Sequence, residues 1–165
     1  MIRTYQPSDA TKLSEMYAEF EPKGFAMGLP PANVCRREDW LQSLTKGEQL
    51  VACEGERIVG HVAIMPTGAP STGTGCHGHS AEVAVFVHQK FRGRDIGAAL
   101  VGATLERAKD MGVRHLWAYT SAFNTAANAT FKKQGFRRFP QRDGMGEVIF
   151  ARPVPQRTGA IAQVA

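Results

Sequence analysis

Residues 81–111 constrain the fold more than any other part of the sequence. They begin with AEVAVFV, Ala81 to Val87, a short apolar run typical of a buried strand. After a basic turn that contains glycine, Gly97 to Met111 carries apolar residues at helical spacing and ends before Gly112. A helix that begins just after such a strand presents unpaired backbone N–H groups with partial positive charge. This stretch therefore predicts a strand–turn–helix unit able to hold phosphate oxygens.

The other predicted elements follow in a mixed order. Apolar periodicity predicts a helix from Ser8 or Asp9 to Phe20, and loops rich in Gly and Pro are expected at residues 21–31 and 66–79. Further helices are expected at about residues 36–45 and 125–134, and further strands at residues 2–5, 50–53, 58–65, 115–119, 136–139 and 147–150. This order predicts an α+β fold with a mixed, largely antiparallel central sheet flanked by about four helices, and not a doubly wound parallel sheet.

Length and composition fit one domain. The 165 residues, 43% hydrophobic and 21% charged, suffice for a single core without a disulfide scaffold. Three widely spaced cysteines, Cys35, Cys53 and Cys76, predict reduced thiols. No apolar run approaches the roughly 18 residues of a membrane span, and no signal-peptide pattern opens the sequence. We therefore expect a cytoplasmic protein with no membrane partner, a domain over residues 1–152 and a tail over residues 153–165.

The turn between the predicted strand and helix reads Arg92-Gly93-Arg94-Asp95-Ile96-Gly97. Glycines let a backbone approach an anion, and the two arginines would place permanent charge beside it. Each feature alone has an ordinary alternative, because glycines near helix starts are commonly turns and arginine pairs are commonly solvated. The formal charge of +5 would also fit a nucleic-acid-binding domain, but the basic residues form no single stripe with interleaved aromatics.

Two motifs together carry a family resemblance. The first is R-x-x-x-x-G, Arg92 to Gly97, between a strand and a helix, and the second is N-x-x-A-x-x-x-F-x-x-x-G-F, Asn124 to Phe136, after the next strand. Over about residues 2–150 the chain resembles the GNAT superfamily of acyl-CoA-dependent N-acyltransferases, with spacing nearest to the phosphinothricin acetyltransferase branch. The family signature Q/R-x-x-G-x-G/A is matched except at Asp95, where glycine is usual.

The resemblance implies acetyl-CoA as the acyl donor and no metal. The donor would be clamped between the strands at residues 81–87 and 115–119, and would pair with the first as an added strand does. Amides of residues 93–98 would hold its pyrophosphate, Asn124 would bond its pantetheine or cysteamine part, and Phe131 would lie near the thioester. The expected donor-binding residues are Val85, Phe86, Val87, Arg92, Gly93, Arg94, Asp95, Ile96, Gly97, Ala98, Asn124 and Phe131.

The aspartate in the signature requires a physical explanation. Aspartate tolerates left-handed backbone angles better than most residues, so the turn itself can form. Its carboxylate would weaken pyrophosphate binding unless it points outward or caps the helix by accepting from N–H groups. We therefore expect Asp95→Gly to tighten CoA binding.

Direct transfer requires a neutral amine, whereas an alkyl ammonium with a pKa of about 10.4 is mostly protonated at neutral pH. Glu82, at the start of the predicted strand at residues 81–87, is the candidate base. The alternative is that Glu82 is only an exposed carboxylate at the edge of a strand, with no catalytic role. A backbone N–H near Val85 would stabilise the oxyanion. A Tyr usually protonates the leaving thiolate in this family, but Phe131 stands at the matching position. Tyr119, Tyr17 or water would substitute, or the thiolate would leave unassisted.

The acceptor pocket is expected from the two loops rich in Gly and Pro and from the second helix. Arg36 and Arg37 would hold the carboxylate of an amino acid, or would form a solvated helix face. The sequence CHGH, Cys76 to His79, would lie near the acceptor and supply an auxiliary base, or would ligate zinc with a fourth ligand missing.

The predicted function is transfer of an acetyl group from acetyl-CoA to a primary amine of a small molecule. A catalytically inert CoA-binding or regulatory module is the alternative, favoured by Asp95 and Phe131. No nucleic acid is expected as a partner. A homodimer stays open, as does the identity of the amine.

Overall fold

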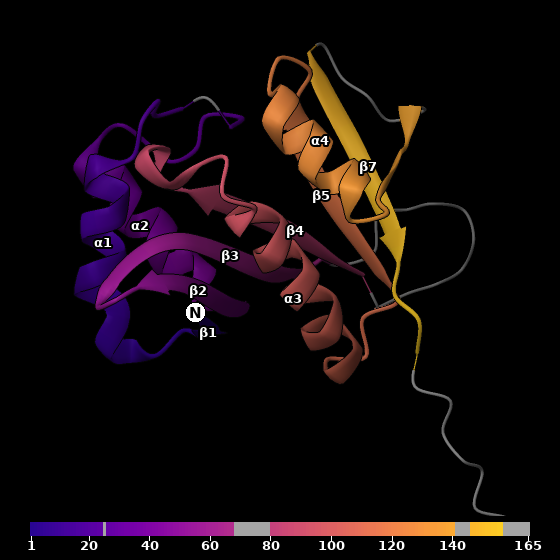
Figure 1. Ribbon diagram of the computed structural model, residues 1–165, viewed down its shortest axis with the longest axis horizontal. Helices are drawn as coiled ribbons and strands as arrows, with labels where there is room; N and C mark the ends of the chain where they lie inside the picture. The colour runs from indigo at the N-terminus through magenta and orange to yellow at the C-terminus, as the bar shows by residue number, and fades with distance from the viewer. Residues whose placement is uncertain (25, 68–79, 141–145, 157–165) are drawn as a thin grey trace, which may run out of the picture.

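The computed structural model describes residues 1–24, 26–67, 80–140 and 146–156 (Figure 1). Seven strands form one sheet in the order β1-β2-β3-β4-β5-β7-β6. The strands are β1 (Ile2–Thr4), β2 (Glu48–Glu54), β3 (Arg57–Thr67), β4 (Ser80–Val87), β5 (His115–Ser121), β6 (Arg137–Arg138) and β7 (Glu147–Pro153). The helices are α1 (Ala10–Glu19), α2 (Val34–Leu44), α3 (Ile96–Asp110) and α4 (Thr125–Lys133), with short 3₁₀ turns η1 (Pro7–Asp9) and η2 (Gln89–Phe91).

Neighbouring strands are antiparallel throughout the sheet except at β4 and β5. These two run parallel, and their register pairs join Ser80–Glu82 to His115–Trp117. Beyond them β4 continues to Val87 and β5 to Ser121 with no further register pair, so the two strands part at their carboxyl ends. Strands that part in this way expose backbone N–H and C=O groups that a ligand can use.

Apolar cores lie on both faces of the sheet. On one face, α3 and α4 bury Leu100, Val101 and Phe131 against the central strands. On the other face, α1 and α2 pack on a cluster that includes Tyr17 and Phe86. Figure 1 shows β5, β7 and α4 to the right, α1, α2 and β1–β3 to the left, and β4 with α3 between them. The carboxyl end of β4 therefore lies where the two halves of the molecule meet.

The predicted fold and order of elements are confirmed, and only boundaries differ. Helix α2 begins at Val34 instead of about residue 36, because the Asn33 side chain caps it by accepting from the Arg36 N–H at 3.0 Å. The β2–β3 hairpin turns at Gly55, whose φ of +58° suits glycine. The strand expected at residues 136–139 covers only Arg137–Arg138.

Two further expectations concern the chain as a whole. No helix among the described residues is long and apolar enough to cross a membrane. The division into a domain over residues 1–152 and a tail stays a prediction, since residues 157–165 lie outside the described part of the chain.

Candidate active site

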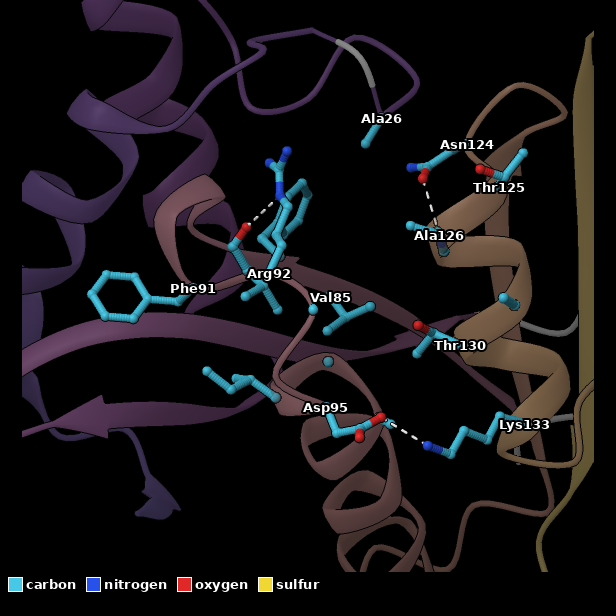
Figure 2. A pocket seen from close by; sticks show the side chains of 18 of the residues that line it. Ala26, Val85, Phe91, Arg92, Asp95, Asn124, Thr125, Ala126, Thr130 and Lys133 are labelled. Atoms are coloured by element: carbon cyan, nitrogen blue, oxygen red, sulfur yellow. Dashed lines mark hydrogen bonds and ion pairs between the residues drawn. The ribbon is translucent and has the colours of Figure 1, made fainter.

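A cleft of about 640 Å³ lies beside the carboxyl end of β4. One wall is the end of β4 with the turn into α3, and the opposite wall is α4 (Figure 2). The segment after α1 contributes residues at one edge, including Ala26 (Figure 2). Predicted donor-binding residues on this cleft are Val85, Phe86, Val87, Arg92, Gly93, Asp95, Ile96, Gly97, Ala98 and Asn124.

The pairing of β4 with β3 orients the backbone of β4 toward the cleft. The His88 N–H donates to the Val59 carbonyl oxygen at 2.9 Å, and the two strands are antiparallel. Backbone groups alternate along a strand in such a pair, so the N–H and C=O groups of Phe86 point to β3 as those of His88 do. Val85 and Val87 consequently turn their N–H and C=O groups away from β3, to the side on which the cleft lies. This is the orientation that an extended ligand requires to pair with a strand.

The turn into α3 leaves the start of that helix without a side-chain cap. Gly93 has a φ of +75° and Asp95 a φ of +55°, so both adopt the left-handed conformation. Asp95 occupies the N-cap position, but its side chain makes no capping hydrogen bond. Ile96, Gly97 and Ala98, which form the first turn of α3, line the cleft. An uncapped helix start beside a cleft favours an anion there.

The Asp95 carboxylate turns instead across the mouth of the cleft. Its Oδ1 accepts a hydrogen bond from Nζ of Lys133, at the end of α4, at 2.7 Å (Figure 2). This hydrogen bond and the positive charge of Lys133 hold the pKa of Asp95 below its usual value. Of the two arrangements that sequence reasoning allowed, helix capping is therefore wrong. The carboxylate points away from the helix and is paired.

Arg92 lines the cleft, but it also binds groups of the protein itself. Its Nε donates to the Val87 carbonyl oxygen at 3.0 Å, and its Nη2 donates to the Glu21 carbonyl oxygen at 2.7 Å. Its guanidinium lies 5.0 Å from the centroid of the Phe20 ring. Arg92 thus joins the segment after α1 to the end of β4. Sequence reasoning missed this function, and the predicted phosphate contact stays a prediction.

Asn124 starts α4 and also faces the cleft. Its Oδ1 accepts from the Ala127 N–H at 3.1 Å, which caps the helix. Its side-chain nitrogen points toward the cleft (Figure 2). A side-chain amide in this position has two N–H donors for a carbonyl oxygen of a ligand. The geometry is therefore compatible with the predicted contact to the pantetheine chain.

Phe131 does not reach the cleft. The side chain is 2% exposed, and its ring packs against Phe136 and Phe150 in the core on the α3 side. It lies one helical turn after Ala127, which both borders the cleft and packs against the same core, so Phe131 lies in the core beneath this part of α4 and is not among the lining residues. Phe131 is therefore no direct lining residue of the cleft, and its place near the thioester stays a prediction.

Arg94 also lies outside the cleft lining. Its guanidinium forms an exposed ion pair with Glu54 at 3.3 Å and lies 5.1 Å from the centroid of the Phe91 ring. Two arginines separated by a single glycine thus have different surroundings. Only Arg92 of the pair borders the cleft.

The two candidate catalytic residues share the sheet face opposite α3. Val83 and Ala118 belong to the core on the α3 side, so Glu82 and Tyr119, their neighbours in sequence, point the other way. Burial raises the pKa of Glu82, and the negative charge of Glu147 raises it further. Tyr119 is 36% exposed. Neither residue lines the described cleft, and the catalytic roles of both stay predictions.

Tyr17, the other tyrosine considered as an acid, is a core residue. It is fully buried, and its hydroxyl lies 2.8 Å from Nδ1 of His61, whose Nε2 lies 2.9 Å from Oε1 of Gln49. Burial raises the pKa of Tyr17 and lowers the pKa of His61 to about 3. Tyr17 therefore has no access to a leaving thiolate.

The expected arginine pair on α2 does not act as a pair. Arg37 is buried, and its Nη1 donates to the carbonyl oxygens of Pro31 and Ala32 at 3.3 and 3.2 Å. Arg36 is exposed. A joint carboxylate site of the two is therefore wrong. The CHGH sequence lies outside the described residues, and within those residues no group of three His, Cys, Asp or Glu could hold a metal ion.

Sequence reasoning missed the α4 wall of the cleft. Ala126, Thr130 and Lys133 line it from positions i, i+4 and i+7 of that helix, and Phe123, 80% exposed, stands just before the helix. The helical spacing was a usable signal, because residues at these positions share one face. The sequence did not show which face of α4 borders the cleft.

These elements recur in known proteins. The model of the Acetyltransferase (GNAT) family matches residues 10–136, well over half of the sequence. The chain belongs to this family. The matched range contains β4, the turn into α3 and all of α4, and so both walls of the cleft. The protein is an acetyltransferase by membership of the GNAT family.

Individual relatives agree with this assignment. YwnH of Bacillus subtilis (strain 168), named "Putative phosphinothricin acetyltransferase", is 27% identical over 112 residues, which are 68% of each chain. The structure of yncA from Salmonella typhimurium with acetyl-CoA has a TM-score of 0.72 at 17% identity and covers 98% of both chains. Ribosomal-protein-alanine N-acetyltransferase from Brucella melitensis has a TM-score of 0.71 at 24% identity, over 93% of this chain and 99% of its own. The two solved structures share the fold.

Proposed function

We propose that this GNAT acetyltransferase transfers the acetyl group of acetyl-CoA to a primary amine of a small molecule. The observation that carries the proposal is the cleft at which β4 parts from β5 beside the uncapped start of α3. An extended donor with a neutral chain and an anionic pyrophosphate matches such a cleft, since a strand end and a helix start provide the two kinds of contact.

In this proposal the pantetheine chain pairs with β4. The Val87 carbonyl oxygen already accepts from Arg92, so the backbone groups of Val85 and the Val87 N–H are the ones offered to the donor. The Asn124 side-chain amide donates to a carbonyl oxygen of the same chain. The N–H groups of the first turn of α3 hold the pyrophosphate.

Acetyl transfer then proceeds by direct attack. The amine nitrogen forms a bond to the thioester carbon, the C–S bond breaks, and the amine proton passes to Glu82 directly or through water. A backbone N–H near Val85 stabilises the oxyanion. The thiolate takes a proton from water or Tyr119, or leaves unprotonated, because a thiol pKa of about 8.5 makes it a good leaving group. The raised pKa of Glu82 makes it a stronger base than an ordinary carboxylate.

A thiol-release assay with acetyl-CoA tests the proposal. The acceptors are amino acids and their analogues, polyamines, aminoglycosides and peptides with free N-termini. A small-molecule acceptor is expected to give turnover well above the hydrolysis of acetyl-CoA alone. Amino acid analogues are the first acceptors to assay, because the relative YwnH is named for phosphinothricin. Turnover with peptides alone would contradict the small-molecule part, and binding of CoA without turnover on any amine would contradict acetyl transfer.

The role of Glu82 is tested by the pH dependence of kcat/KM. A base must be deprotonated, so kcat/KM should fall as the pH drops through the raised pKa of Glu82. Glu147→Gln removes the negative charge that raises this pKa and should move the acid limb to lower pH. Glu82→Gln should lower kcat/KM by about a hundredfold, within the usual range for loss of a general base.

The matched control is Glu56→Gln, since the Glu56 side chain is 96% exposed and belongs to the β2–β3 turn. We expect its profile to match that of the wild type. A Glu82→Gln enzyme with the wild-type profile would exclude Glu82 as the base.

A further inference from the structure

The ion pair between Asp95 and Lys133 spans the cleft that the donor would occupy. Asp95 belongs to the turn into α3, and Lys133 lies near the end of α4 on the opposite wall (Figure 2). Both residues line the cleft. The two charged groups therefore meet at the place where the uncapped helix start favours an anion.

The pair contributes little as a structural brace. The Lys133 side chain is 63% exposed and the Asp95 side chain 77%, and an ion pair so open to water is weak and screened by salt. Asp95 also adopts a left-handed backbone conformation without capping the helix that follows it. Two exposed groups held this loosely can exchange partners when another ion arrives.

We propose that Lys133 binds a phosphate of the acyl-CoA donor, and that Asp95 holds the Lys133 ammonium group until the donor enters. The inference rests on the proposed function. A CoA phosphate group accepts hydrogen bonds as the Asp95 carboxylate does. A hydrogen bond from the Lys133 ammonium group to a phosphate oxygen is charge-assisted, like the one that Lys133 makes to Asp95. The partial positive charge at the start of α3 also favours the phosphates. The acyl-CoA donor therefore makes two favourable contacts, to Lys133 and to the helix start, whereas Asp95 makes one, to Lys133.

This exchange changes the meaning of an aspartate in the signature. In the free protein the carboxylate is neutralised by Lys133 and does not present its full charge to an approaching phosphate. Asp95 then weakens donor binding chiefly by competing for the lysine. It also keeps the ammonium group at the mouth of the cleft, where the phosphate needs it.

Calorimetric titration of the free protein with CoA tests the role of Lys133 without any acceptor amine. Lys133→Gln should weaken CoA binding by about tenfold, the loss expected for one hydrogen bond to a charged group. Lys132→Gln is the matched control, because Lys132 has the same charge, lies next in sequence and is not among the lining residues. The control should bind CoA as the wild type does.

A second pair of variants separates phosphate contact from simple neutralisation of Asp95. In the Asp95→Asn background no carboxylate remains to be neutralised, yet Lys133→Gln should still weaken CoA binding. If Lys133→Gln has no effect in that background, Lys133 serves only to cancel the charge of Asp95, and the proposal is overturned. Asp95→Asn alone should bind CoA more tightly than the wild type, by a few-fold.

Dephospho-CoA identifies which phosphate is bound. Loss of the Lys133→Gln effect with dephospho-CoA assigns the lysine to the 3′-phosphate, and an unchanged effect assigns it to the pyrophosphate. If wild-type protein binds CoA and Lys133→Gln binds it equally well, this inference alone fails. If the wild type binds no CoA at all, the proposed function fails with it.

Discussion

The two helices that border the cleft begin in opposite ways. Helix α4 is capped by the Asn124 side chain, which accepts from the Ala127 N–H at 3.1 Å. Helix α3 has Asp95 at the same position, but the carboxylate is turned to Lys133 and the first N–H groups receive no side-chain cap. Both residue types are good caps, so the difference is not one of propensity. The helix start proposed to bind the pyrophosphate is thus left open, and the start of α4 is closed by the oxygen of its own Asn124 side chain.

Closing the open start of α3 with a carboxylate should have the largest effect on CoA affinity. A Cβ at Gly97 would meet Cγ2 of Val87 at 3.5 Å, an ordinary contact, so a side chain fits there. Gly97→Asp places a carboxylate in the first turn, where it favours the helix, but on the groups proposed for the pyrophosphate. We expect CoA affinity to fall by at least about a hundredfold, because opposed like charges cost several kcal/mol.

Two measurements make this result specific. Calorimetry gives the CoA affinity, and thermal unfolding should give a Tm for Gly97→Asp no lower than that of the wild type. Gly97→Ala is the control for size, and it should keep most of the affinity while raising helix propensity. Wild-type affinity in Gly97→Asp would show that the α3 start does not bind the pyrophosphate.

Substitution of Asn124 should have the next largest effect and separates its two contacts. Asn124→Asp keeps an oxygen that caps α4 but loses the N–H donors that point to the cleft, so Tm should hold while CoA affinity falls about tenfold. Asn124→Ala loses both, and stability should drop as well, by about 1 kcal/mol. Unchanged CoA affinity in Asn124→Asp would mean that the residue is a cap and nothing more.

The smallest effect is expected at the residue that leaves α3 open. Asp95→Gly removes a carboxylate near the proposed phosphate site, frees Lys133, and relieves a φ of +55° that glycine adopts readily. CoA affinity should rise a few-fold, the scale of an exposed charge interaction, and Tm should not fall. A lower affinity in the calorimeter would mean that the aspartate supports the turn more than it repels the donor.

Local patterns predicted the fold and most of the residues along the β4 side of the cleft. The apolar run of β4 and the glycines of the following turn each act within a few residues, so the sequence contains them directly. Helix α2 was predicted from about residue 36, and the capping residue Asn33 accounts for the small difference.

Contacts between distant residues were not predictable in this way. Arg92 donates to the Glu21 carbonyl oxygen from 71 residues away, and Lys133 reaches Asp95 across 38 residues. Such partners depend on how the loop after α1 and the end of α4 are placed by tertiary packing, which no local pattern encodes. Phe131 is a different case, because the family resemblance placed it by a thioester, whereas its burial against Phe136 and Phe150 depends on tertiary packing.

The short pairing of β4 with β5 has a thermodynamic consequence. The register pairs at Ser80–Glu82 are where these strands join the two halves of the sheet, and the proposed donor would add its own chain along β4 beyond them. A molecule that binds only the native state stabilises it by mass action, by about 2.7 kcal/mol at one hundred times its Kd. The melting temperature of this protein should therefore follow the concentration of its donor, and heat stability becomes a measure of how full the site is.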